Sequence, residues 1–99
     1  MTNETLDVSK DKFYVYVLYS YKDKNFYTGF TSDLRQRLSS HARGEVRSTS
    51  HRRPLKLIHY EYFIDEQDAK AREVFLKSGF GREQLKKALQ RTLVSPGKL

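Results

Sequence analysis

Three segments of the chain carry the hydrophobic pattern of β-strands. Residues Phe13 to Tyr19 are apolar or aromatic at every position, which is typical of a strand covered on both faces. A short polar turn over residues 22–25 precedes a second strand predicted over Phe26 to Thr31, and so short a connection requires an antiparallel hairpin. A third strand is predicted over Leu55 to Ile64, where two sets of side chains alternate.

The first predicted helix lies between the second and third strands. Ser32–Asp33 supplies an N-cap and a first-turn carboxylate, and Gly44 supplies a C-terminal stop. Apolar residues recur at four-residue spacing in this helix and predict one buried stripe, made of Leu34, Leu38 and Ala42. The hydrophilic segment from Glu45 to Pro54 is predicted to be a loop.

Two further helices are predicted after the third strand. Asp65 is expected to cap a helix that ends near Gly79, and the next helix is predicted over Arg82 to Leu93. The order strand-strand-helix-strand-helix-helix implies an α/β (α+β) domain over residues 13–93, in which helices flank a small three-stranded sheet. Residues 1–12 are predicted to be a flexible leader and residues 94–99 a loose tail.

The amino-acid composition limits the classes of function that this domain can have. The chain has 99 residues, which suffice for one core, and a net charge of +7, which favours polyanionic partners such as nucleic acid. A basic protein without such a partner is the alternative. The absence of cysteine excludes disulfides and thiolate metal sites. No apolar run is long enough to span a membrane and no signal-like leader is present, so a cytoplasmic location without membrane partners is expected.

Two tyrosines of the predicted hairpin are candidates for chemistry. Tyr16 and Tyr27 lie on neighbouring strands, so their phenols are expected to meet near one face or edge of the sheet. A phenol oxygen can relay or accept a proton, or hydrogen-bond a phosphate oxygen. The alternative is that both are ordinary half-buried strand residues, since five other tyrosines occur in the chain.

Arg37 and His41 lie one turn apart on the first predicted helix and flank its apolar stripe, so both are expected at the rim of the core. A guanidinium there can clamp a phosphate, and a histidine can move a proton. A solvated basic helix face is the alternative.

Glu73 borders the inward face of the second predicted helix, between Ala69 and Leu76. A carboxylate in this position needs a cationic partner. A divalent ion such as Mg²⁺ fits, because it binds through one or two carboxylates and fills its other positions with water and phosphate oxygens. An internal ion pair with Arg72, Arg37 or a lysine explains the position equally well.

The loop before the third strand is dense in donors to phosphate, namely guanidinium, hydroxyl and backbone N–H groups. The residues expected to contact nucleic acid, from this loop and from the first helix, are Arg35, Arg47, Ser48, Thr49, His51, Arg52 and Arg53. A solvated basic loop is the alternative. His59 alternates within the third strand and is interpreted as a packing residue.

Together these residues resemble the GIY-YIG nuclease superfamily, and in particular its small stand-alone bacterial members. The segments Tyr14-Val15-Tyr16 and Tyr27-Thr28-Gly29 correspond to its two name-giving motifs, although Tyr14 stands in place of the glycine of the first and Thr28 in place of the isoleucine of the second. Arg37 falls at the catalytic arginine and His41 at a histidine that many members carry one turn later. Residues 48–54 and 71–77 resemble the loop and the glutamate helix of the small members.

The resemblance implies a central three-stranded antiparallel sheet and an endonuclease that cuts DNA phosphodiester bonds with one divalent metal ion, Mg²⁺ or Mn²⁺. Glu73 would bind the metal, and Tyr16, assisted by His41, would help to activate water. Arg37 would stabilise charge on the phosphate, and Tyr27 would position phosphate or water. A role in DNA repair or recombination is implied by the same likeness. An asparagine that some members use is absent here, since only Asn3 and Asn25 occur.

Two other functions remain open at this point. The chain can be a nucleic-acid-binding module that keeps the nuclease fold without cutting, with Glu73 in an ion pair. It can also be an adaptor whose basic surface meets acidic proteins. Substrate choice must come from the surface of this domain or from a protein partner that targets it.

Overall fold

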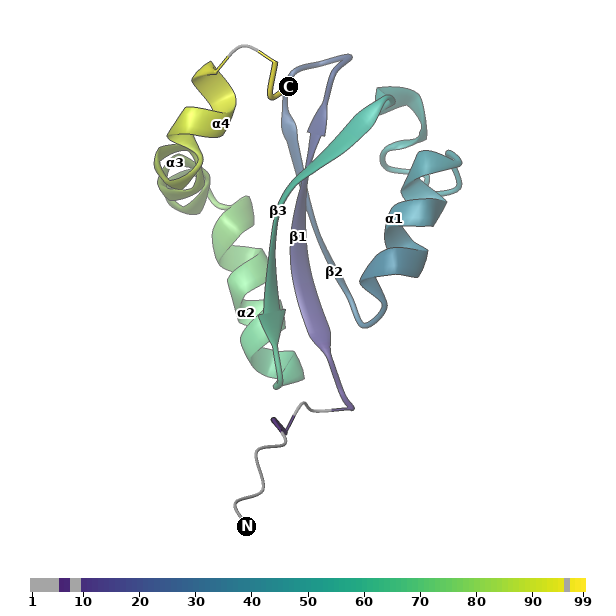
Figure 1. The fold of residues 1–99 in the computed structure, drawn as a ribbon, viewed down its shortest axis with the longest axis vertical. Helices are drawn as coiled ribbons and strands as arrows, with labels where there is room; N and C mark the ends of the chain where they lie inside the picture. The colour runs from purple at the N-terminus through teal and green to yellow at the C-terminus, as the bar shows by residue number, and fades with distance from the viewer. Residues whose placement is uncertain (1–5, 8–9, 96) are drawn as a thin grey trace.

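A computed structural model describes residues 6–7, 10–95 and 97–99 of the chain (Figure 1). The predicted leader and tail lie partly outside these residues. The elements, in chain order, are β1 (Phe13–Ser20), β2 (Phe26–Thr31), α1 (Leu34–Ala42), a short 3-10 helix η1 (Ser50–Arg52), β3 (Leu55–Phe63), α2 (Glu66–Lys77), α3 (Gly79–Ala88) and α4 (Gln90–Val94). None of the described helices is long and apolar enough to cross a membrane.

The three strands form one antiparallel sheet in the order β2-β1-β3, which confirms the predicted hairpin and fold class. β1 lies in the centre, and its residues 15–18 are all buried, as the unbroken apolar run of this strand predicts. The register places Tyr16 opposite Gly29 of β2 and opposite Tyr60 of β3. Tyr16 therefore stands in the middle row of the sheet.

The two faces of the sheet differ in chemistry. In Figure 1, α2, α3 and α4 lie on one side of the sheet and α1 lies on the other. The buried apolar core is on the α2 side and consists of Val15, Val17, Ala69, Leu76 and Leu85. On the α1 side the buried groups include the polar side chains of His41 and Thr49. One face thus holds the apolar core, and the other holds buried polar groups.

The predicted N-cap of α2 is confirmed, whereas α1 is capped by Asp33 and has no acidic residue in its first turn, so the prediction from Ser32–Asp33 was wrong by one residue. The Asp33 carboxylate accepts from the backbone N–H of Gln36, and Gly44 ends the helix with a φ of +76°. The Asp65 carboxylate accepts from the N–H groups of Gln67 and Asp68. Local hydrogen bonds fix these helix ends, so short-range sequence is enough to predict them.

The predicted buried stripe of α1 was wrong. Ala42 is exposed and Leu34 and Leu38 are only half-buried, whereas the buried residues of this helix are Ser40 and His41. The reason is that α1 packs its polar side against the tyrosines of the sheet. Hydrophobic periodicity finds the buried face of a helix only where the opposing surface is apolar.

The prediction of a single helix over Arg82 to Leu93 was wrong, because this segment belongs to two helices that meet at Leu89. In addition, Gly79 begins α3 rather than ending α2. Ser78 is both the C-cap of α2 and the N-cap of α3. Its hydroxyl donates to the Phe75 carbonyl (2.6 Å) and accepts from the Gly81 N–H (3.0 Å). This shared cap leaves no room for a linker between the two helices.

Gly81→Ala is expected to lower the free energy of unfolding by about 1–3 kcal/mol, because a Cβ there would lie 1.9 Å from the Phe75 carbonyl oxygen and the helices would have to separate. Gly79→Ala is the matched control, since nothing lies within 4 Å of its Cβ position and alanine favours helix. Urea unfolding followed by circular dichroism measures both. Equal midpoints for the two variants would contradict the close approach.

Candidate active site

Tyr16 and Tyr27 meet on the α1 side of the sheet, with their ring centroids 6.3 Å apart. Gly29 makes this possible, because a Cβ at position 29 would lie 2.4 Å from both Cζ and Oη of Tyr16. The Tyr16 ring therefore crosses the neighbouring strand where that strand has no side chain. The glycine of the second motif gives space to the tyrosine of the first.

His41 connects the tyrosine pair to the loop. Its ring lies edge-on to both tyrosines, with centroids 5.5 Å from Tyr16 and 5.2 Å from Tyr27. Its Nε2 is 2.7 Å from the Tyr16 hydroxyl oxygen, and its Nδ1 is 2.7 Å from Oγ1 of Thr49. The rim position predicted for His41 was wrong, since only 1% of this residue is exposed. Tyr16, His41 and Thr49 form a continuous hydrogen-bonded chain.

Burial controls the protonation of this chain. It raises the pKa of Tyr16 to about 12, helped by the nearby charges of Tyr27 and Glu73 and opposed by a hydrogen-bonding contribution from Arg37. Burial, together with the charge of Arg37, lowers the pKa of His41 to about 4. Near pH 7 the phenol therefore keeps its proton and the imidazole is neutral, so one ring nitrogen donates and the other accepts.

Arg37 joins the site from the same helix as His41, one turn earlier. Hydrogen-bonding interaction with the Tyr16 phenol raises the pKa of its guanidinium, and Tyr27 contributes in the same direction. Arg37 is half-buried, and its guanidinium has five N–H donors, more than the two tyrosines can use. The structure thus brings Arg37, His41 and both tyrosines together.

Glu73 lies on α2, on the other side of the sheet from α1. Its charge acts on the pKa of Tyr16, and its Oε2 lies 2.9 Å from the Lys77 ammonium. Arg72, an alternative partner, instead donates two hydrogen bonds to Glu61 (2.8 and 3.1 Å). Within the described part of the chain no cluster of three or more histidine or acidic residues is present, so a metal ion at Glu73 would have few protein ligands. This donor set fits Mg²⁺ or Mn²⁺ only with water and phosphate as the other ligands.

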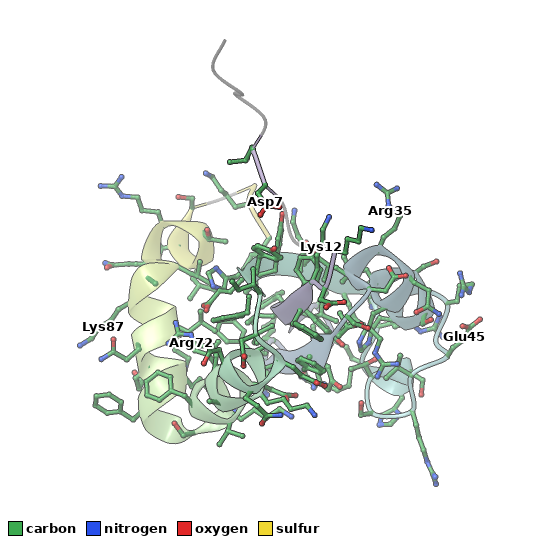
Figure 2. The ribbon with its side chains drawn as sticks, turned by 90° about the horizontal axis from the view of Figure 1, so that it is seen from below. Asp7, Lys12, Arg35, Glu45, Arg72 and Lys87 are labelled. Carbon is green, nitrogen blue, oxygen red and sulfur yellow. The ribbon has the colours of Figure 1, made fainter. Side chains whose placement is uncertain are left out.

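The residues expected to contact nucleic acid fall into two groups. The first is exposed and consists of Arg35, Arg47, Ser48 and His51; Figure 2 shows Arg35 pointing away from the ribbon. The second shapes the loop: Thr49 is fully buried against His41, Arg52 pairs with Asp23, and Arg53 donates to the carbonyls of Ser50 (2.9 Å) and Ala42 (3.3 Å). The Thr49 hydroxyl therefore orients His41 and does not face a ligand.

His59 lies in β3 beside Glu61, with its Nε2 2.9 Å from the Glu61 carboxylate. The Arg72 and His59 contacts lower the pKa of Glu61 against the opposing effect of its burial. This cluster is built from β3 and α2 and uses neither of the two tyrosines, so we treat it as a structural feature.

The depressed pKa of His41 predicts a loss of stability in mild acid. The unfolded imidazole takes up a proton near pH 6.5, whereas the folded one resists protonation down to about pH 4. The contribution of the neutral His41 imidazole to the free energy of unfolding is therefore complete above pH 6.5. It is lost as the pH falls towards 4, and the total loss is about 3 kcal/mol. Urea unfolding at pH 7 and pH 4.5 measures it against His41→Gln, in which the other titrating groups remain. An equal acid loss in the variant would contradict the assignment.

Comparison with known proteins agrees with this fold. The model of the GIY-YIG catalytic domain matches residues 12–87 of the chain. The protein therefore belongs to the GIY-YIG family, a family of nucleases.

Within this family the chain is similar to UPF0213 proteins. It is 38% identical to one from Pediococcus acidilactici over 81 residues, which cover 79% of this chain and 82% of the relative. It is also 38% identical to one from Clostridium perfringens over 65 residues, or 65% of this chain and 69% of the relative. The solution NMR structure of a UPF0213 protein from Bacillus halodurans matches with a TM-score of 0.51 and 34% identity, over 78% of this chain and 84% of that one.

Proposed function

We propose that this protein is a metal-dependent endonuclease that hydrolyses DNA phosphodiester bonds at the site formed by Tyr16, Tyr27, Arg37, His41 and Glu73. The observation that carries the proposal is the buried chain from the Tyr16 hydroxyl through His41 to Thr49, which lies next to the Arg37 guanidinium and close enough to the Glu73 carboxylate for its charge to affect Tyr16. A buried structural tyrosine also needs a hydrogen-bond partner. The support for a relay is that this chain joins the phenol to an imidazole, which can accept its proton, next to the guanidinium of Arg37.

The relay runs through neutral groups. A phenol whose pKa is about 12 is not a base near pH 7, so Tyr16 accepts a proton only if it passes its own proton on. In the tautomer that permits this, the Tyr16 hydroxyl donates to Nε2 of His41, and the Nδ1–H of His41 donates to Oγ1 of Thr49. The attacking water gives one proton to the Tyr16 oxygen as the phenol proton moves to Nε2, and the resulting hydroxide bonds to phosphorus.

The other side chains act on the phosphate. Arg37 offers guanidinium donors to the oxygens that gain charge in the transition state, and such electrostatic stabilisation is the largest part of phosphoryl-transfer catalysis. Tyr27, beside both His41 and Tyr16, orients the phosphate or the water. Glu73 would hold one Mg²⁺ or Mn²⁺, which when bound supplies positive charge to the phosphate and lowers the pKa of water. The bond from phosphorus to the leaving oxygen then breaks, this oxygen takes up a proton from solvent, and His41 returns its extra proton to solvent, which completes the hydrolysis.

The surface residues would hold the strand in place. Arg35, Arg47, Ser48 and His51 are exposed on α1 and the following loop and offer donors to the DNA backbone. Arg52 and Arg53 would support the loop from within, through their contacts to Asp23 and to backbone carbonyls. Contacts of this kind fix the position of a strand without reading its bases.

One observation favours a second function, a nucleic-acid-binding module that does not cut. The Lys77 ammonium already gives the Glu73 carboxylate a cationic partner. Isothermal titration with Mn²⁺ distinguishes the two functions, because the nuclease binds the ion at Glu73 and the binding module does not. Wild-type protein is compared with Glu73→Gln in this titration.

The proposed activity is tested with a panel of labelled substrates: single-stranded, duplex and branched DNA, and RNA, each incubated with Mg²⁺ or Mn²⁺. Metal-dependent cleavage of at least one DNA substrate is expected. No cleavage of any substrate, together with no Mn²⁺ binding, would favour the binding module.

A further inference from the structure

A cavity of about 440 Å³ opens outside the site described above, between the β1–β2 turn, η1 and the first turns of α3. Four of the side chains that line it are cationic, and they come from three separate parts of the chain: Lys24, Arg52, Arg82 and Lys86. Asp23 is the only carboxylate in the lining, and Phe26 supplies an apolar surface. The lining therefore carries an excess of positive charge.

Internal contacts neutralise only part of this charge. Arg52 donates from Nε and Nη2 to the Asp23 carboxylate, which is why the pKa of Asp23 falls to about 2. The Ser20 hydroxyl donates to the Arg52 carbonyl (2.6 Å) and so holds this pair in place. Within residues 10–95, Lys24 and Arg82 have no ion-pair partner, and their charges remain available to a ligand.

The position of the cavity relates it to the active site. Phe26, in its wall, directly precedes Tyr27 in β2, and Gly29, which contacts the Tyr16 ring, comes three residues later. That separation is about 10 Å along a strand. α3 also lies on the same side of the sheet as α2, the helix that carries Glu73 (Figure 1). β2 is an edge strand of the sheet, so a nucleic-acid strand that follows this edge from the two tyrosines towards Phe26 would reach the cavity.

We propose that this cavity binds a backbone phosphate of the substrate strand, about two or three nucleotides from the bond that is cut, at ~3.4 Å of rise per nucleotide. Lys24 and Arg82 are its main ligands, and the Asp23–Arg52 pair is the rigid wall. A polynucleotide is the occupant because the chain carries a net charge of +7, and because the cavity continues the line of β2 from the site of cleavage. The inference rests on the proposed function, whose substrate it would hold.

Binding of labelled oligonucleotides in the presence of EDTA tests this phosphate site without requiring cleavage. The test variant is Lys24→Asn/Arg82→Gln, since asparagine tolerates the positive φ of 59° at position 24 and glutamine keeps the helix. The matched control is Lys87→Gln/Arg91→Gln, which removes two charges from exposed positions outside the cavity; Figure 2 shows Lys87 directed away from the ribbon.

The test variant is expected to raise Kd by about 10-fold for a long oligonucleotide and to lower the salt slope by about one to two. The control should change both much less. Equal changes in the test and control variants would overturn the phosphate site. If the protein cuts nothing, the proposed activity fails while this binding result still stands.

Discussion

Glu73→Gln is expected to reduce the rate of DNA cleavage by about 10³-fold, because a metal ion bound at this carboxylate supplies several kcal/mol of transition-state stabilisation. Glutamine keeps the shape of the side chain and removes its charge. Since Glu73 is half-buried and, among the residues that the structure describes, forms an ion pair only with Lys77, the fold should be retained. Cleavage of a labelled substrate at saturating Mg²⁺ or Mn²⁺ measures the loss.

Glu66→Gln is the matched control for this substitution. Glu66 lies on the same helix and pairs with Lys70, four residues later (3.2 Å), as Glu73 pairs with Lys77 (2.9 Å). The control removes an equivalent ion pair away from the tyrosines, and its activity should match that of the wild type. Full activity in Glu73→Gln would rule out a role for this carboxylate in cleavage.

Tyr16→Phe is expected to reduce cleavage by about 10²–10⁴-fold, the range that general acid–base catalysis contributes. The phenylalanine ring still fills the space over Gly29, so the sheet is preserved. What is lost is the hydroxyl that faces Nε2 of His41. DNA binding should change little, because the phenol acts on the water and not on the strand as a whole.

Two further measurements keep this prediction specific. Tyr62→Phe removes a hydroxyl from an exposed tyrosine of β3 and should have no effect on cleavage. The free energy of unfolding of Tyr16→Phe reports the cost of leaving the buried His41 nitrogen without its partner, about 1–3 kcal/mol. A variant that remains folded and cuts at the wild-type rate would show that the chain from Tyr16 to Thr49 is only structural.

Local features of the fold were predictable from the sequence, and tertiary ones were not. Asp33 and Asp65 cap their helices through bonds to neighbouring N–H groups, which short-range sequence determines. The burial of His41 depends instead on what α1 faces, namely two tyrosines from distant strands. An apolar stripe with Leu34 at its start was the wrong guide, because here the hydrogen-bonded polar side of the helix is buried.

The candidate site shows the same division. The pairing of β1 with β2 was predictable, and with it the meeting of Tyr16 and Tyr27. The role of Thr49 was not, since its contact to His41 depends on how a loop folds back over α1. The space that Gly29 leaves for the ring could have been inferred from the strand register, because Gly29 lies directly opposite Tyr16.

The close packing of the Tyr16 ring over Gly29 has a consequence for the comparison of related sequences. A side chain at position 29 and an aromatic ring at position 16 exclude each other, since even a methyl group at 29 would overlap the phenol. The two positions are therefore expected to change together among related chains. A relative with another residue at position 29 should either lack the tyrosine at position 16 or hold its ring in a different position. The residue at position 29 would therefore help to distinguish relatives that cut nucleic acid from those that only bind it.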